Sequence, residues 1–192
     1  MGEATRRNVA LFGPAGSGKG TQAEFLTREL GIEHIATGEM LREELARGTE
    51  LGQTLAAYLD VGKLVPDEVI VAMIRHRLSE AQADGGFVLD GFPRTLAQAR
   101  SLLELLVGLQ RPLDIAVVLD VPSDQLVVRL SRRAALEKRA DDTPAVIAER
   151  LRIYHDETEP VLEFLAQTVP MVRLDGSRPV AEVSQTLLKA IV

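Results

Sequence analysis

The sequence GPAGSGKGT at residues 13–21 is typical of a loop that binds phosphate groups. Residues 8–12, directly before it, form a short apolar run with the length of a buried strand, and residues 21–30 after it have apolar side chains near helical spacing. Between a strand and a helix, the glycines let successive backbone N–H groups converge on an anion. The helix N-terminus adds roughly half a positive charge, and Lys19 adds a full charge. The sequence therefore predicts a site for nucleotide phosphates.

The loop departs from the general motif just after its lysine. The usual pattern has Ser or Thr in that position, where the hydroxyl group holds Mg²⁺. Here Gly20 follows Lys19, and Thr21 comes one place later. The strand and the helix on either side still favour nucleotide phosphate binding.

The composition favours one compact, acidic domain. The chain has 192 residues, a formal net charge of −6 and no cysteine. The negative charge argues against general binding to nucleic acids or to anionic membranes. Without cysteine there is no disulfide, no thiolate zinc site and no cysteine nucleophile. Because no apolar run approaches membrane-spanning length and residues 1–7 lack the apolar core of a signal peptide, we expect a cytoplasmic protein.

Apolar runs alternate with helical patterns along the chain, which predicts an α/β fold. The expected strands are residues 8–12, 32–36, 87–89, 114–121 and 169–174. The expected helices are residues 21–30, 38–46, 51–61, 67–83, 95–109, 123–133, 144–165 and 179 onward. Continuous apolar runs predict a five-stranded parallel sheet with helices on both faces, which is a three-layer sandwich. We expect Thr37, Asp67 and Ser123 to cap helices.

Ligands of such sheets bind beyond the carboxyl ends of the strands. Asp90 and Asp120 follow two of the expected strands, and either carboxylate could organise Mg²⁺ beside the phosphate loop. For Asp120 the simpler interpretation is that it caps the next turn. Asp90 is the better metal candidate, because the turn after it ends in Arg94 and would bring a guanidinium group into the same cleft. The scattered histidines predict no metal site and are expected to be structural or exposed: His34, His76 and His155.

Six arginines gather in a short part of this acidic chain: Arg129, Arg132, Arg133, Arg139, Arg150 and Arg152. One interpretation is a solvated helical face with partners such as Glu137 and Glu149. The other is catalytic, because an enzyme that transfers a phosphoryl group must stabilise the charge on it, and one arginine can contribute roughly 10³–10⁵ in rate. Arg129 and Arg133 are four residues apart and so share a helical face, which favours the second interpretation.

Several segments in this order resemble the adenylate kinases, and the likeness covers nearly the whole chain. The matching segments are residues 13–21, 37–42, 62–68, 90–94 with Gln98, and 175–179. The spacing of the arginines at positions 129, 133, 139 and 150 is similar to that of the short-lid members of the family. The resemblance implies a single P-loop kinase domain over residues 1–192. Within it, residues 36–65 would form a mobile AMP-binding segment and residues 133–142 a short lid.

The resemblance also implies a role for particular residues at the ATP site. The phosphates of ATP would be held by Gly16, Ser17, Gly18, Lys19, Gly20 and Thr21 of the loop and by Arg129 and Arg133. The backbone near Arg178 would meet the ATP base, and Asp90 would orient Mg²⁺ through water. The catalytic set would be Lys19, Arg94, Arg129, Arg133, Arg139 and Arg150.

A second set of residues would bind AMP. It comprises Thr37, Arg42, the backbone of Lys63, Leu64 and Val65, the turn Gly91, Phe92 and Pro93, and the side chains of Arg94, Gln98, Arg139 and Arg150. Gln98 would read the edge of adenine, and Arg94, Arg139 and Arg150 would grip the AMP phosphate and the transition state. The family-like bond between Phe92 and Pro93 is expected to be cis.

The implied reaction is an in-line transfer from ATP·Mg²⁺ to AMP that gives two ADP, by a monomer without zinc. Three positions depart from the family pattern: Ala15 stands for Pro, Glu39 for Asp, and Lys138 for the Gly before the lid arginine. Two other functions remain open. One is a UMP/CMP kinase on the same fold, although Thr37 and Thr95 favour AMP. The other is a non-catalytic nucleotide-binding regulator.

Overall fold

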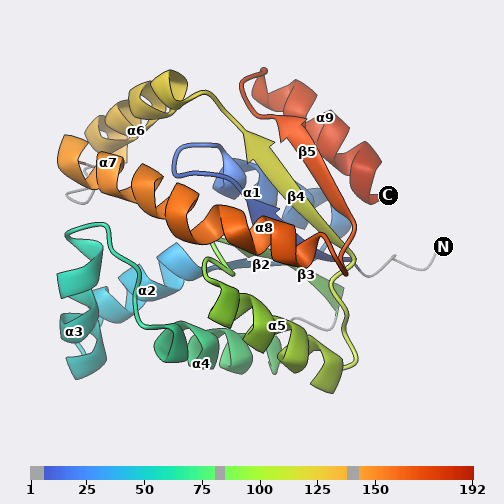
Figure 1. Ribbon diagram of the computed structural model, residues 1–192, viewed down its shortest axis with the longest axis horizontal. Coiled ribbons are helices and arrows are strands. Elements are labelled where there is room, and N and C mark those ends of the chain that lie inside the picture. The colour runs from blue at the N-terminus through green and yellow to red at the C-terminus, as the bar shows by residue number, and fades with distance from the viewer. Residues whose placement is uncertain (1–6, 81–84, 138–142) are drawn as a thin grey trace.

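A computed structural model of the protein describes residues 7–80, 85–137 and 143–192 (Figure 1). Its sheet contains the strands β1 (Arg7–Phe12), β2 (Glu33–Ala36), β3 (Gly86–Asp90), β4 (Ile115–Asp120) and β5 (Met171–Asp175). The strand order is β2-β3-β1-β4-β5, and every neighbouring pair is parallel. The predicted five-stranded parallel sheet is therefore confirmed.

The helices lie on both faces of this sheet. They are α1 (Lys19–Leu30), α2 (Thr37–Ala46), α3 (Glu50–Leu59), α4 (Asp67–Leu78), α5 (Leu96–Gly108), α6 (Ser123–Glu137), α7 (Pro144–Ile153), α8 (Glu159–Leu165) and α9 (Val180–Ile191). A π-helical segment, Tyr154–Thr158, joins α7 to α8. In the described parts of the chain, no helix is both long and apolar enough to pass through a membrane.

Alternate side chains of the central strand supply two separate cores, as expected for a pleated strand buried on both faces. Val9 and Leu11 of β1 pack with the buried residues of α1 and α9. Ala10 and Phe12 face the other way and pack with those of α4, α5 and α8. The fold is therefore the predicted three-layer sandwich, with α1 and α9 on one face and α4, α5 and α8 on the other (Figure 1).

Two of the predicted helix caps are wrong. The N-cap of α2 is Ala36, and Thr37 is already the first helical residue. The N-cap of α4 is Pro66, and Asp67 likewise lies inside the helix. In both cases the side chain contacts a distant segment instead of its own helix end, so tertiary contacts override the local capping preference.

Three helices also differ in length from the prediction. Helix α4 ends at Leu78 instead of near residue 83, and the predicted helix 144–165 is interrupted by the π-helical segment. Helix α6 continues to Glu137, since Ala134, Ala135 and Leu136 are strong helix formers. The first part of the predicted lid, residues 133–137, is therefore helical, and residues 138–142 lie outside the described residues.

Candidate active site

The phosphate loop connects the carboxyl end of β1 to the N-terminus of α1. Gly16 and Gly18 have φ angles of 83° and 97°, in the left-handed region where glycine meets no Cβ penalty. Gly18 is the N-cap of α1, no side chain caps that helix, and no acidic residue occupies its first turn. The N–H groups of the first turn can therefore serve an anion. Ser17 is buried in the loop, and Gly20 and Thr21 follow in the first turn of the helix.

Lys19 folds back over the loop. Its Nζ donates hydrogen bonds to the carbonyl oxygens of Gly13 at 2.7 Å and Pro14 at 3.0 Å. Burial is the main cause that lowers the pKa of Lys19 to about 8; Arg94 and Arg133 lower it further, and Asp90 opposes them. The lysine is thus held at the loop by neutral carbonyl groups and is short of negative charge, which a bound phosphate would supply.

Asp90 ends β3 beside the loop, and the sheet register pairs it with Leu11 of β1 and Ala36 of β2. A Cβ atom at Gly20 would lie 3.6 Å from its Oδ2, so the carboxylate faces the first turn of α1. Burial acts to raise the pKa of Asp90, but His34, Lys19 and Arg94 together bring this pKa below its usual value. Asp90 is therefore an ionised, largely buried carboxylate at the place where the phosphates would lie.

His34 of β2 contacts the same carboxylate, which the sequence did not indicate. Its Nε2 lies 3.6 Å from Oδ2 of Asp90, a distance beyond hydrogen bonding, so the contact is electrostatic. Burial opposes the charged form of His34, but Asp90 and Glu39 raise the pKa of its ring above the usual value. Adjacent parallel strands brought the two side chains together, and no spacing in the sequence could reveal that.

Asp120, the other candidate carboxylate, is in a different setting. It is exposed at the end of β4 and forms an ion pair with Arg173, with 2.9 Å between its Oδ2 and the Nε of Arg173. The backbone carbonyl of Asp120 accepts a hydrogen bond from the N–H of Gly176. These contacts favour the simpler interpretation, in which Asp120 organises the turns at this edge.

The turn after Asp90 contains the cis Phe92–Pro93 bond that the family resemblance implied. The carbonyl oxygen of Gly91 accepts hydrogen bonds from the Thr37 hydroxyl at 3.0 Å and from Nε of Arg94 at 2.7 Å. Burial lowers the pKa of the Arg94 guanidinium, Arg150 adds to this, and Asp90 opposes it. The turn therefore holds a half-buried cation that interacts electrostatically with both Asp90 and Arg150.

The arginines of α6 and α7 divide into two groups. Arg133 acts electrostatically on Lys19 and Arg150 acts on Arg94, so both lie within electrostatic reach of those two residues. Arg129 donates a hydrogen bond to the carbonyl oxygen of Gly176 at 3.0 Å. Arg132 is exposed, and Arg152 forms ion pairs with Glu149 and Asp156 on the surface of α7. The solvated-face interpretation therefore fits Arg132 and Arg152 but not the other described arginines of the set. Arg139 lies outside the described residues.

The segment between α3 and α4 lies against α7. A Cβ atom at Gly62 would lie 2.9 Å from Cγ1 of Val146 and 3.3 Å from Cγ of Arg150. Lys63 acts on the pKa of Glu149, which is lowered chiefly by its hydrogen bond from Arg152. Next along the chain, Leu64 is half-buried and Val65 is buried. This contact brings the predicted AMP-binding backbone to Arg150.

Three further predicted residues have these surroundings. Arg42 is on α2, and a Cβ atom added to Gly38 would lie 3.3 Å from Nη1 of Arg42. Arg178 is exposed beside Asp175 and Glu182, each at 3.5 Å. Gln98, on α5, is buried, and its amide oxygen accepts a hydrogen bond from the N–H of Arg94 at 2.8 Å.

Sequence reasoning also missed two residues that support this turn. Asp67 accepts a hydrogen bond from Nε2 of Gln98 at 2.7 Å, and the Thr158 hydroxyl donates to the carbonyl oxygen of Arg94 at 3.1 Å. Asp67 was interpreted as a helix cap, and Thr158 carries no signal of its own. Each forms its hydrogen bond with a residue more than thirty positions away in the chain, and a single sequence does not show which distant residues become neighbours.

Comparison with known proteins gives one consistent result. A family model described as Adenylate kinase matches residues 11–169. A protein named Adenylate kinase from Stenotrophomonas maltophilia is 45% identical over 183 residues, which is 95% of this chain and 98% of that protein. A protein of the same name from Thermobifida fusca is 43% identical, over 95% of this chain and 97% of that protein. Another from a Cyanothece species is 46% identical, over 92% of this chain and 90% of that protein.

Proposed function

The chain belongs to the adenylate kinase family of phosphotransferases, and we propose that it transfers the γ-phosphoryl group of ATP reversibly to AMP, giving two ADP. One observation carries this proposal. Lys19, Asp90 and Arg94 influence one another at the carboxyl end of the sheet, and two arginines from other elements join them, since Arg133 acts on Lys19 and Arg150 acts on Arg94. Phosphoryl transfer requires little more of a protein than such positioning and charge stabilisation.

The phosphate loop is the proposed donor site. The unhindered N–H groups at the start of α1, together with Lys19, suit the phosphates of ATP. Arg129 and Arg133, on one face of α6, would extend this positive surface, and the backbone near Arg178 would meet the base. The low pKa of Lys19 supports this, because a buried ammonium group gains most from an added anion.

The turn that follows Asp90 is the proposed acceptor site. The guanidinium of Arg94 and that of Arg150 are close enough for Arg150 to lower the pKa of Arg94, and two neighbouring guanidinium groups suit a phosphate anion. The AMP phosphate would fill this role, with Arg139 as a further partner. Thr37, Arg42, Gly91 and the backbone of residues 63–65 would complete the site, and Gln98 would read the base.

Asp90 is the proposed Mg²⁺ residue. Mg²⁺ is typically held by one or two carboxylates, with water and substrate phosphates as its other ligands, and the ionised Asp90 fits this pattern. No cluster of three or more His, Cys, Asp or Glu residues suited to a metal occurs in the described parts of the chain, so Asp90 would act together with the nucleotide. When bound, the ion would neutralise charge on the phosphates.

We further propose that residues 36–65 and 133–142 move within the one domain 1–192 and close over the substrates. Closure would exclude water, which competes with AMP as acceptor. The contact of Gly62 with α7 supports this arrangement, because it joins the AMP segment to the helix that follows the lid. Both nucleotide sites would lie on one chain, which suits a monomer in the cytoplasm that takes part in nucleotide biosynthesis and homeostasis.

An acceptor panel tests the proposed function. Purified protein is incubated with Mg·ATP and either AMP, CMP, UMP or no acceptor, and the nucleotides are separated by chromatography. We expect rapid transfer to AMP and little to the pyrimidine nucleotides. Preference for CMP or UMP would instead identify a UMP/CMP kinase, and ATP binding without transfer to any acceptor would identify a regulator.

A further inference from the structure

The amide group of Gln98 is held at both ends by groups of opposite character. Its Oε1 accepts a hydrogen bond from the backbone N–H of Arg94 at 2.8 Å, and its Nε2 donates one to Oδ1 of Asp67 at 2.7 Å. The side chain is only 2% exposed. These contacts are therefore made inside the protein, where the loss of a hydrogen bond is most costly.

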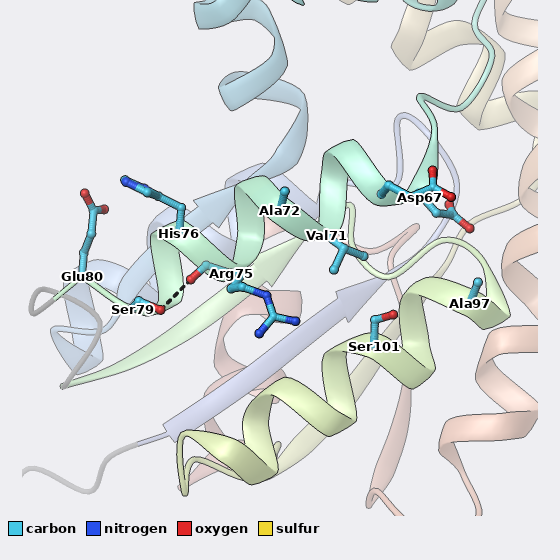
Figure 2. A pocket seen from close by; sticks show the side chains of 10 residues that line it. Asp67, Val71, Ala72, Arg75, His76, Ser79, Glu80, Ala97 and Ser101 are labelled. Carbon is cyan, nitrogen blue, oxygen red and sulfur yellow. Dashed lines mark hydrogen bonds between the residues drawn. The ribbon is translucent and has the colours of Figure 1, made fainter.

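Asp67 is itself held in place. Its Oδ2 accepts a hydrogen bond from the Thr95 hydroxyl at 2.8 Å, and the same hydroxyl accepts one from the N–H of Gln98 at 3.2 Å. Figure 2 shows where this happens: Asp67 is at the start of α4, at the same end of a groove as Ala97 near the start of α5. The two helix ends are thus joined by a chain of hydrogen bonds that terminates at Arg94.

The contacts permit only one orientation of the amide. An ionised carboxylate can only accept hydrogen bonds, and a backbone N–H can only donate. If the Gln98 amide turned over, its oxygen would face the carboxylate of Asp67 and its NH₂ group would face the N–H of Arg94. Both hydrogen bonds would be replaced by repulsion between like groups.

The fixed amide keeps one N–H and one oxygen lone pair for a further partner, because each end has capacity for two hydrogen bonds. Adenine offers a donor, its 6-amino group, beside an acceptor, the ring N1. Hypoxanthine has the same shape with this pattern inverted, since it carries a 6-oxo acceptor beside an N1–H donor. An amide that is free to turn could serve either base, whereas a fixed amide serves only one.

We propose that Asp67 is a positioning residue that fixes the Gln98 amide and makes the acceptor site select 6-aminopurine over 6-oxopurine nucleotides. This inference rests on the proposed function, in which Gln98 faces the base of AMP. Asp67 does not touch the nucleotide in this account. It acts through Gln98, and Thr95 supports it from the other side.

The test is the Asp67→Asn variant, assayed with Mg·ATP and either AMP or IMP as acceptor. Asparagine keeps the shape of the side chain but can donate as well as accept hydrogen bonds. Only the backbone N–H of Arg94 would then still disfavour the turned orientation of the Gln98 amide. We expect the ratio of kcat/KM for AMP to kcat/KM for IMP to fall at least tenfold, mainly through the two KM values, while kcat with AMP stays within about threefold of wild type.

Glu68→Gln is the matched control, because Glu68 is the other acidic residue in the first turn of α4 and is exposed. It removes the same charge and should leave the ratio unchanged. Thr95→Val is a second test, because it keeps the Asp67 carboxylate but removes the hydrogen bond that Oδ2 of Asp67 accepts. We expect this variant to lower the AMP-to-IMP ratio of kcat/KM by about threefold. Circular dichroism establishes that each variant is folded.

The inference is overturned if folded Asp67→Asn and Thr95→Val both keep the wild-type ratio, since Asp67 would then only join α4 to α5. A fall in stability without a change in the ratio would point to the same structural role. A different result, wild-type protein that transfers to neither AMP nor IMP, would contradict the proposed function itself. The two failures are therefore distinguishable.

Discussion

The two proposed nucleotide sites are built in different ways. At the donor site, the partners of Lys19 are carbonyl groups only six and five residues before it in the chain. At the acceptor site, the hydrogen bonds join Thr37 to Gly91, 54 residues apart, and Thr158 to Arg94, 64 residues apart. The phosphate loop of the donor site is a local backbone conformation, whereas the acceptor site depends on the complete fold.

This difference suggests how each site responds to change. A local loop depends on its glycines and on the helix that follows it. A site assembled from distant side chains can lose one partner and alter the position of several others. The predictions below test whether the two sites can be damaged separately.

Arg94→Ala should have the largest effect, because the half-buried guanidinium of Arg94 interacts with both Asp90 and Arg150. We expect kcat to fall roughly 10³-fold or more, as when a phosphate-stabilising arginine is lost, while the Kd for ATP stays within a few-fold of wild type. Steady-state kinetics and calorimetry measure the two quantities. Arg100→Ala, at an exposed position on α5, the helix that follows the turn of Arg94, is the control. Activity of Arg94→Ala within a few-fold of wild type would mean that the cleft has been assigned wrongly.

Arg150 and Arg152 give a sharper comparison within one helix. Arg150 acts on Arg94, whereas Arg152 is 59% exposed and paired with Glu149 and Asp156. We expect Arg150→Ala to lower kcat/KM for AMP by roughly 100-fold, in the range found for lost charge-stabilising donors. Arg152→Ala should change it by less than about threefold, as for surface ion pairs. Equal effects in the two variants would support a solvated helical face instead of a catalytic group.

Two glycine variants test whether the sites are independent. Gly16 and Gly91 have φ angles of 83° and 79°, and an added Cβ would lie 2.9 Å from Cγ of Leu130 or 2.8 Å from Nη2 of Arg94, respectively. The left-handed conformation alone costs an alanine about 1–2 kcal/mol. We therefore expect Gly16→Ala to weaken ATP binding about tenfold and Gly91→Ala to weaken AMP binding about tenfold. Loss of both affinities in either variant, measured by calorimetry, would show that the sites are coupled.

The donor site should also respond to pH. Lys19 loses its charge near pH 8 in the folded protein, so kcat/KM for ATP, which reports groups of the free enzyme, should fall about tenfold per pH unit above that value. The Lys19→Arg variant, which stays charged, should lack this decline even if its overall rate is lower. A wild-type profile that is flat from pH 7 to pH 9.5 would contradict a catalytic charge on Lys19.

As the pH rises, the stability of the protein should change in the direction opposite to kcat/KM for ATP. Between the folded pKa of about 8 and the ordinary value of 10.5, the unfolded chain binds a proton that the folded chain has lost. The contribution of Lys19 to the free energy of unfolding therefore rises with pH in this interval. Denaturant unfolding of wild type and Lys19→Arg at pH 8 and pH 9.5 separates this effect from alkaline unfolding.

The sequence predicted the donor site and the sheet because both depend on local patterns. Residues 13–21 carry their own conformational preference, and continuous apolar runs are sufficient to indicate buried parallel strands. The failures have one physical cause. Thr37 and Asp67 have the side chains of helix caps, but each bonds to a segment that becomes a neighbour only after folding. His34 reaches Asp90 in the same way, through the pairing of β2 with β3.

The proposed reaction is the reversible exchange of a phosphoryl group between two adenine nucleotides. It is tested most directly by supplying the purified protein with Mg²⁺ and ADP alone and following the nucleotides by chromatography. We expect ATP and AMP to appear in equal amounts until equilibrium is reached. Release of inorganic phosphate with AMP but without ATP, or ADP that stays unchanged, would contradict it.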